Sequence, residues 1–165
     1  MKKDLGVHPY LFPMPVLMIA TYGKNDKVDV MNMAWGGICD NNKVALNITE
    51  AHKTSENIKK RGAFTISVAD IDHLEESDFF GIASGNTMED KFERTGMKAV
   101  KSTRVDAPII EEYPITLECK VIKIQNDEFG FRVIGEIVNV IADEKILDEN
   151  NKVDPSKLNA FVFDQ

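Results

Sequence analysis

A chain of 165 residues with 43% hydrophobic and 28% charged residues has the size and composition of one globular domain with a sizeable core. We therefore expect a single domain over residues 1–165, and the composition excludes an intrinsically disordered chain. The net charge of −7 disfavours nucleic acid and anionic membrane surfaces as partners. Because no apolar run approaches the roughly 18 residues that span a bilayer, we also expect a soluble protein.

The two cysteines, Cys39 and Cys119, match neither a zinc-binding nor a thioredoxin spacing. We expect both to be small buried hydrophobic residues, in a cytoplasmic protein whose thiols stay reduced. Residues 1–20 superficially resemble a signal peptide, but Asp4 lies in the basic region and prolines interrupt the apolar stretch, which argues against secretion.

The first half of the chain predicts strands joined by tight turns. Residues 16–21 and 28–33 form a predicted hairpin across the turn at 23–26, and a further strand is predicted at 44–48. A short helix follows over 54–60, with Thr54 in a position suited to capping and Gly62 at its end. Residues 63–68 then return to a strand.

The second half begins with an interrupted helical pattern. It covers 74–95, breaks near 84–86, resumes at 88–92 and ends at Gly96. A less regular connection over 97–114 leads to the two longest strand signals, at 115–124 and 131–141, joined by a turn at 126–130. The alternation of the first slips at 122–124 and the second contains Gly135, which predicts bulges in a curling sheet.

Consecutive, strongly bent strands with tight turns close most naturally into a small antiparallel barrel with Greek-key links. The predicted fold class is therefore mainly β with short helices. A doubly wound parallel sheet is disfavoured, because it needs a crossover helix after every strand. The charged segment 143–154 is interpreted as a solvated loop.

Common catalytic signatures are absent from the sequence. His8, His52 and His73 are too widely spaced for a helical pair of metal ligands, so no metal site is predicted. Neither a Rossmann glycine motif nor a Walker motif is present, so nucleotide binding of those two kinds is not indicated.

Two short polar segments suit a small phosphorylated ligand. In His52-Lys53-Thr54-Ser55, two hydroxyls and a cation lie where a helix begins, so free backbone amides and the helix dipole favour an anion there. The alternative is that Thr54 only caps its helix and that Lys53 faces water. The second segment, residues 84–87, places hydroxyl and amide groups around a glycine and is followed by Lys91; its alternative is a plain loop between helices.

A third segment, residues 31–37, suits the rim of a flat aromatic ligand. It combines a strand end with small residues, an amide side chain and Trp35, the only tryptophan of the chain. The alternative is a core aromatic residue followed by a Gly36-Gly37 turn.

Taken in order, these segments resemble those of the flavin reductase-like family of FMN-binding split-barrel proteins, which includes flavoredoxins. The resemblance lies in the Met31-to-Trp35 strand, in Thr54 with Asn57-Ile58, in Ser84-Gly85 with Asp90-Lys91-Phe92, and in the late strand at 133–138. It covers residues 13–143 and implies an antiparallel Greek-key split β-barrel.

The resemblance implies FMN as the cofactor. Contacts to its phosphate and ribityl chain are carried over to Lys53, Thr54, Ser84, Gly85 and Lys91. Contacts to the isoalloxazine ring are carried over to Asn32, Met33, Ala34 and Trp35. No catalytic side chain is expected, because the flavin carries the redox chemistry. The resemblance also implies a homodimer with the flavin near the subunit interface.

Two departures from the family affect the predicted activity. Many family reductases that use NAD(P)H have a histidine before the late-strand glycine, at a position that aligns with Gly130, and this chain has none after His73. Family chains also continue past 161–165 with a further tail, so we expect altered ring contacts there. The sequence therefore predicts an FMN-binding oxidoreductase, either an NAD(P)H-dependent flavin reductase or a flavoredoxin-like carrier with a redox partner protein. The alternative is a non-catalytic barrel that binds FMN or another small phosphorylated ligand.

Overall fold

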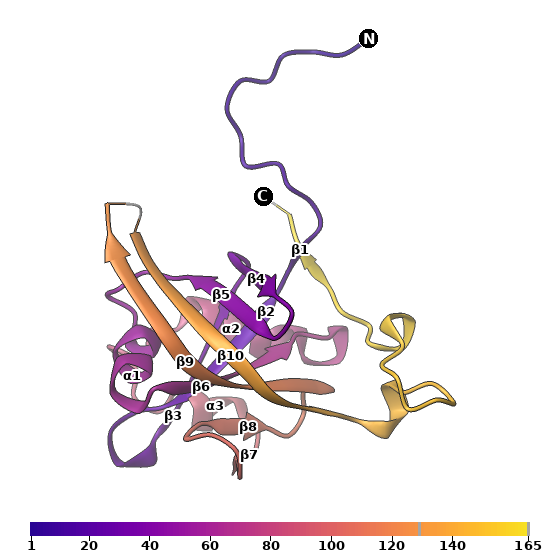
Figure 1. Ribbon diagram of the computed structural model, residues 1–165. Helices are drawn as coiled ribbons and strands as arrows, with labels where there is room; N and C mark the ends of the chain where they lie inside the picture. The colour runs from indigo at the N-terminus through magenta and orange to yellow at the C-terminus, as the bar shows by residue number, and fades with distance from the viewer. Residues whose placement is uncertain (129, 165) are drawn as a thin grey trace.

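The computed structural model describes residues 1–128 and 130–164. Its body is a seven-stranded antiparallel sheet in the order β3-β2-β6-β9-β10-β5-β4 (Figure 1). The strands of this sheet are β2 (Leu17–Tyr22), β3 (Val28–Met33), β4 (Gly36–Asp40), β5 (Lys43–Asn47), β6 (Ala63–Val68), β9 (Ile115–Asp127) and β10 (Gly130–Ala142). A separate two-stranded sheet, β7 (Ala99–Lys101) with β8 (Pro108–Ile110), was not predicted.

The two edge strands of the large sheet, β3 and β4, follow each other directly in the chain. Only Ala34 and Trp35 separate them, so the sheet must curl until its two edges meet. At this junction a Cβ added to Gly36 would lie 2.9 Å from Leu17 Cδ1 of β2 and 3.1 Å from Leu46 Cδ2 of β5, so the two ends of the sheet are in contact. The predicted split barrel is confirmed.

The hairpin of β9 and β10 supplies the longest strands and bends across the barrel (Figure 1). Its register shifts between Ile134 and Gly135 and again between Ile137 and Asn139, as the slipped alternation predicted. A Cβ on Gly135 would lie 2.5 Å from Phe64 Cζ, so the glycine lets β10 pass close to the core. Part of the predicted turn at 126–130 lies outside the described residues.

In the part of the chain that the structure describes, three α-helices flank the sheet. They are α1 (Lys53–Arg61), α2 (Leu74–Ile82) and α3 (Lys91–Thr95). Gly62 and Gly96 end α1 and α3 in the left-handed conformation, with φ values of 64° and 73°. The helical pattern predicted to resume at 88 does so only at Lys91, because Thr87 and Met88 donate their amides to Ser84 in a turn. Short 3-10 helices lie at Lys24–Asp26, Ile71–His73, Glu144–Ile146 and Pro155–Lys157.

Among the described residues, apolar side chains on the two faces of the sheet form the two larger cores, and Ala63, Val105 and Ala107 form a third, small cluster. Alternation along β2 divides the two larger cores, since Leu17 and Ile19 belong to the barrel interior while Met18 and Ala20 belong to the layer that contains the aromatic residues of α2 and α3. Ile146 is fully buried, so the segment 143–154 is not wholly the solvated loop that was predicted. The prediction for Cys119 is confirmed, but the one for Cys39 is wrong: this thiol lies exposed on edge strand β4.

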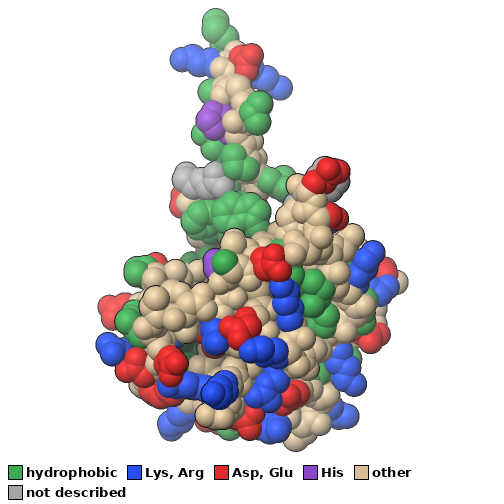
Figure 2. Space-filling view, turned by 90° about the vertical axis from the view of Figure 1, so that its left-hand side faces the viewer, with side chains coloured by type: hydrophobic (Ala, Val, Ile, Leu, Met, Phe, Trp, Pro, Cys, Tyr) green, Lys and Arg blue, Asp and Glu red, His purple; other side chains and the backbone are tan. Residues whose placement is uncertain are grey.

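The N-terminal segment 1–13 stands away from the body as an extended arm (Figures 1 and 2). It carries exposed apolar side chains and leads into β1 (Met14–Pro15), which pairs with β11 (Val162–Phe163) near the other end of the chain. Gln165 lies outside the described residues. No helix in the described part of the chain is long and apolar enough to cross a bilayer.

Candidate functional site

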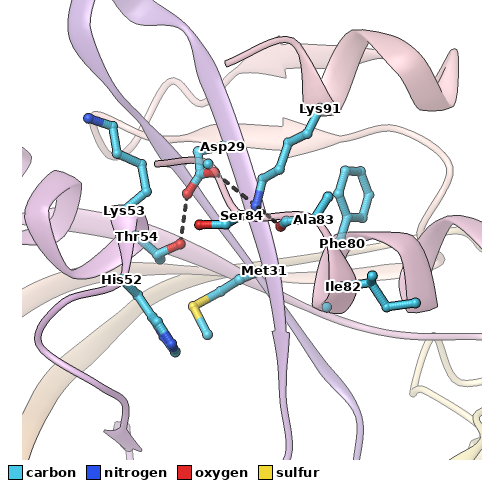
Figure 3. A pocket seen from close by; sticks show the side chains of 12 residues that line it. Asp29, Met31, His52, Lys53, Thr54, Phe80, Ile82, Ala83, Ser84 and Lys91 are labelled. Carbon is cyan, nitrogen blue, oxygen red and sulfur yellow. Dashed lines mark hydrogen bonds and ion pairs between the residues drawn. The ribbon is translucent and has the colours of Figure 1, made fainter. Parts of the chain in front are cut away.

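A small hollow of about 130 Å³ lies where β3, the start of α1, the end of α2 and the start of α3 meet (Figure 3). It brings together all five residues predicted to contact a phosphate and ribityl chain, although they come from three separate parts of the sequence. Its lining consists of Asp29, Met31, His52, Lys53, Thr54, Phe80, Gly81, Ile82, Ala83, Ser84, Gly85 and Lys91.

The N-terminus of α1 opens onto this hollow without a side-chain cap. His52 is the N-cap residue, and its side chain makes no capping hydrogen bond. Uncapped amides at the positive end of a nine-residue helix form a site for an anion. The predicted capping role of Thr54 is wrong, because Thr54 lies inside the helix and its hydroxyl donates to Asp29 Oδ2 at 2.7 Å.

Asp29 is the residue that sequence reasoning missed. It lies on β3, is only 6% exposed, and its Oδ1 is 3.0 Å from the ammonium of Lys91, which is itself 3% exposed. Lys91 also donates to the carbonyl of Ala83 at 3.4 Å. Apart from this ion pair, Asp29 Oδ1 has no hydrogen-bond partner among the described residues. The hollow therefore contains a buried carboxylate beside its buried cation.

Lys53 lies at the rim, and its charge is also paired. Its Nζ is 2.9 Å from Glu56 Oε2, and Figure 3 shows the ammonium directed away from Asp29. Glu56 also bonds Lys60 one turn later, and the Lys60 and Lys53 ammonium groups together lower the pKa of Glu56 to about 2. The Lys53 ammonium is consequently less available to a ligand in the hollow than its position in the sequence suggested.

The loop at Ser84-Gly85 approaches β3 and α1 closely. A Cβ on Gly85 would overlap Asp29 Oδ1 and lie 3.1 Å from Lys53 Cβ, so only glycine fits there without displacing these groups. The Ser84 carbonyl accepts the amides of Thr87 and Met88, which shapes the loop as a turn at the edge of the hollow.

A second, larger hollow of about 600 Å³ lies farther along β3. All four residues predicted to contact the flavin ring line it, so the nine predicted residues fall into two hollows that share β3 and α2. Its lining consists of Val16, Asn32, Met33, Ala34, Trp35, Leu74, Glu75, Ser77, Asp78, Phe161, Val162, Phe163 and Asp164.

Side-chain contacts fix the shape of the second hollow. The Asn32 amide donates to the Ser77 carbonyl at 2.9 Å, and Gly81 leaves space for that amide against α2. Trp35 is 48% exposed and its ring lies 5.7 Å from the ring of Phe163, so β11 forms one wall. The Asn32 side chain is thus committed to α2, which leaves the backbone at 32–35 and the Trp35 ring for a ligand.

Charges in the second hollow are of one sign. Glu75, Asp78 and Asp164 contribute three carboxylates, and the described lining includes no lysine, arginine or histidine. This hollow therefore favours neutral or cationic partners over anionic ones.

The smaller hollow fits the phosphate end of a flavin mononucleotide. An anionic group placed there would meet the uncapped amides of α1 and the Lys91 ammonium. Because Gly85 has no side chain, the group could also lie close to the backbone of the 84–85 loop. The volume of about 130 Å³ is too small for a whole cofactor, since ligand pockets usually measure about 300–1,000 Å³. An aromatic ring would therefore have to lie outside it, along the Met31-to-Trp35 segment. Elsewhere in the described residues, no group of three or more His, Cys, Asp or Glu side chains is arranged for a metal ion.

Comparison with known proteins identifies the class that this fold and site define. Residues 10–156 match the model of the flavin reductase like domain, and the chain belongs to the flavin reductase-like family. The barrel is similar to flavoredoxin of Desulfovibrio vulgaris (Miyazaki F), with a TM-score of 0.93 and 34% identity over 99% of this chain and 88% of that chain.

Two further proteins are similar at lower identity. Flavoredoxin from Methanosarcina acetivorans superposes with a TM-score of 0.84 at 21% identity, covering 96% of this chain and 85% of that chain. An uncharacterized protein of Archaeoglobus fulgidus is 28% identical over 141 residues, which are 84% of this chain and 78% of that protein. The membership in the family that the motifs suggested is confirmed.

Proposed function

We propose that this protein binds FMN and acts as an oxidoreductase through it. The observation that carries the proposal is the uncapped N-terminus of α1, which opens onto a hollow together with Lys91 and Gly85. The flavin ring supplies the redox chemistry when it is bound. The protein contributes position: the α1 amides and Lys91 hold the phosphate, and the backbone of residues 32–35 holds the rim of the ring.

Trp35 provides a direct test of this proposal. It is the only tryptophan, it is half exposed, and it lies in the segment proposed to hold the ring. FMN added to flavin-free protein should quench its fluorescence saturably, and flavin should co-purify with the freshly isolated protein.

Replacing Thr54 and Lys91 together by alanine should weaken FMN retention, because a charged contact to the phosphate is lost. A colourless protein that FMN does not quench would favour the alternative, a barrel for another phosphorylated ligand.

For the electron donor, we propose a protein partner, so that the chain works as a flavoredoxin-like carrier. Three carboxylates without a cation line the larger hollow beside Trp35, which disfavours the anionic NAD(P)H and favours a partner with a basic surface. The absence of a histidine after His73 supports the same choice.

Anaerobic reduction separates the carrier from an NAD(P)H-dependent flavin reductase. FMN-loaded protein is mixed with NADH, with NADPH and with dithionite, and the flavin absorbance is followed. Bleaching by dithionite alone is expected. Rapid bleaching by either nicotinamide would instead establish the reductase, and the Glu75→Gln/Asp78→Asn variant would then show how far the carboxylates slow it.

A homodimer and a cytoplasmic location complete the proposal. The extended arm at 1–13 exposes Leu5, Val7, Tyr10 and Leu11, which a second copy could cover. The exposed free thiol of Cys39 suits a reducing compartment.

A further inference from the structure

Asp29 places a negative charge in the hollow that we propose for the FMN phosphate. This carboxylate is 6% exposed, lines the hollow and almost touches Gly85, the residue that allows a ligand to approach the loop. Its Oδ2 accepts a hydrogen bond from the Thr54 hydroxyl at 2.7 Å, while its Oδ1 has no partner among the described residues besides the Lys91 ammonium. A phosphate entering the hollow would therefore meet an acidic group as well as basic ones.

Both lysines of the site already have a carboxylate partner. Lys91 pairs with Asp29 at 3.0 Å and Lys53 with Glu56 at 2.9 Å, so the two cations and two anions have a formal sum of zero. The pairs differ in burial, because Asp29 and Lys91 are almost inaccessible while Glu56 lies at the surface. Solvent and salt screen the Glu56 charge, but they screen the buried Asp29 charge far less.

We propose that Asp29 sets the affinity for FMN: by keeping the phosphate subsite charge-balanced, it makes the protein bind FMN less tightly than Lys91 and the helix amides alone would. The inference rests on the proposed function and concerns the same site. Its physical basis is that a phosphate carries nearly two negative charges, which a buried carboxylate a few ångströms away repels. The Lys91 ammonium must then be shared between two anionic groups.

The same carboxylate stabilises the protein before the ligand arrives. A buried ammonium without a counter-charge is strongly unfavourable, so Lys91 needs Asp29 while the hollow holds no anion. When FMN leaves, Lys91 is still paired with Asp29, so no buried charge is left unpaired and the flavin-free protein remains stable. An acid at this position thus lowers the affinity for FMN and also keeps the flavin-free protein stable.

The test compares FMN with riboflavin, which lacks the phosphate, on the full chain and on Asp29→Asn. Asparagine keeps an oxygen for the Thr54 hydroxyl and removes the charge. Affinity for FMN should rise at least about tenfold, since one charge at these distances is worth more than that factor. Dissociation of FMN should slow accordingly, and the affinity for riboflavin should stay within about twofold. Asp90→Asn is the matched control. It removes an exposed carboxylate that pairs with Arg94 and that precedes Lys91 in the chain, so it should change neither the affinity for FMN nor that for riboflavin.

Each outcome decides a separate question. If the wild-type protein binds FMN and Asp29→Asn gains less than about tenfold in affinity, this inference is overturned and the proposed function stands. If neither protein binds any flavin, the proposed function fails and the inference fails with it. Should Asp29→Asn not fold, the wild-type protein still decides: an FMN preference over riboflavin below about tenfold supports a balanced subsite, and a larger preference overturns it.

Discussion

Asp29, Thr54 and Lys91 form a buried polar cluster at the junction of β3, α1 and α3. The carboxylate accepts the Thr54 hydroxyl and faces the Lys91 ammonium, so one side chain connects three elements. Removing one partner of a buried ion pair costs far more than removing both, because the remaining charge stays buried without compensation. The cluster therefore links the stability of the empty site to its chemistry.

Lys91→Met should lower the free energy of unfolding by about 3–5 kcal/mol in flavin-free protein, because Asp29 would remain buried and unpaired. Asp29→Asn/Lys91→Met should be more stable than the sum of the two single changes indicates. Urea unfolding followed by Trp35 fluorescence and circular dichroism measures all four proteins. An additive cycle would show that the two charges do not interact.

The two thiols should react very differently. Burial, with a further contribution from the charge of Glu118, raises the pKa of Cys119 to about 12, so this thiol stays protonated and inaccessible at neutral pH. Cys39 is exposed on β4. A thiol reagent at pH 8 should therefore modify Cys39 alone in folded protein and both cysteines in urea; labelling of Cys119 in folded Cys39→Ser would contradict the burial that we describe.

At the scale of elements, the sequence predicted the strands better than the contacts between them. The hairpin of β2 and β3, the helix ending at Gly62 and the bulged β9–β10 pair follow from local alternation and turn residues. Strand β4 was missed because it begins with two glycines, and its other residues are exposed, so no alternation marks it. The short β7 and β8 have three residues each, too few to give a periodic signal.

Asp29 was missed for a different reason. Between Val28 and Val30 it has the pattern of the solvent-facing residue of a strand, yet it is buried. The groups that bury and pair it come from α1 and from Lys91, which are distant in the sequence. Thr54 and Lys91 could be located from motifs, but their shared acidic partner depends on tertiary contacts that one sequence does not display.

Substitution of Gly135 measures how much the close approach of β10 to the core contributes to stability. Gly135→Ala would place a methyl group 2.5 Å from Phe64 Cζ, so the ring or the strand must shift. We expect a loss of about 1–3 kcal/mol in the free energy of unfolding, as for other overpacked cores. Gly37→Ala is the control, because nothing lies within 4 Å of its added Cβ. Equal stability of the two variants in urea would contradict the close approach.

At the scale of the whole molecule, the arm at 1–13 projects from a body covered with charged side chains of both signs (Figure 2). The arm carries charged side chains near its start and exposed apolar side chains along the rest of its length. Within the arm, His8 stacks on Tyr10 with their ring centroids 4.7 Å apart, and Tyr10 lies 5.8 Å from Phe12. An apolar segment of this kind has much to gain from burial against a second copy.

We therefore expect the arm to stabilise a homodimer. Sedimentation velocity over a concentration series should show a dimer for the full chain and a shift towards monomer when residues 1–12 are removed. Tyr10→Ser/Leu11→Ser should weaken the dimer too, since these two side chains are 53% and 83% exposed in the single chain and would gain from burial. Lys2→Ser/Lys3→Ser alters the same arm without removing apolar surface and should leave the dimer intact. A full chain that sediments as a monomer throughout would exclude the dimer, and an unchanged dimer after the deletion would place its interface on the barrel instead.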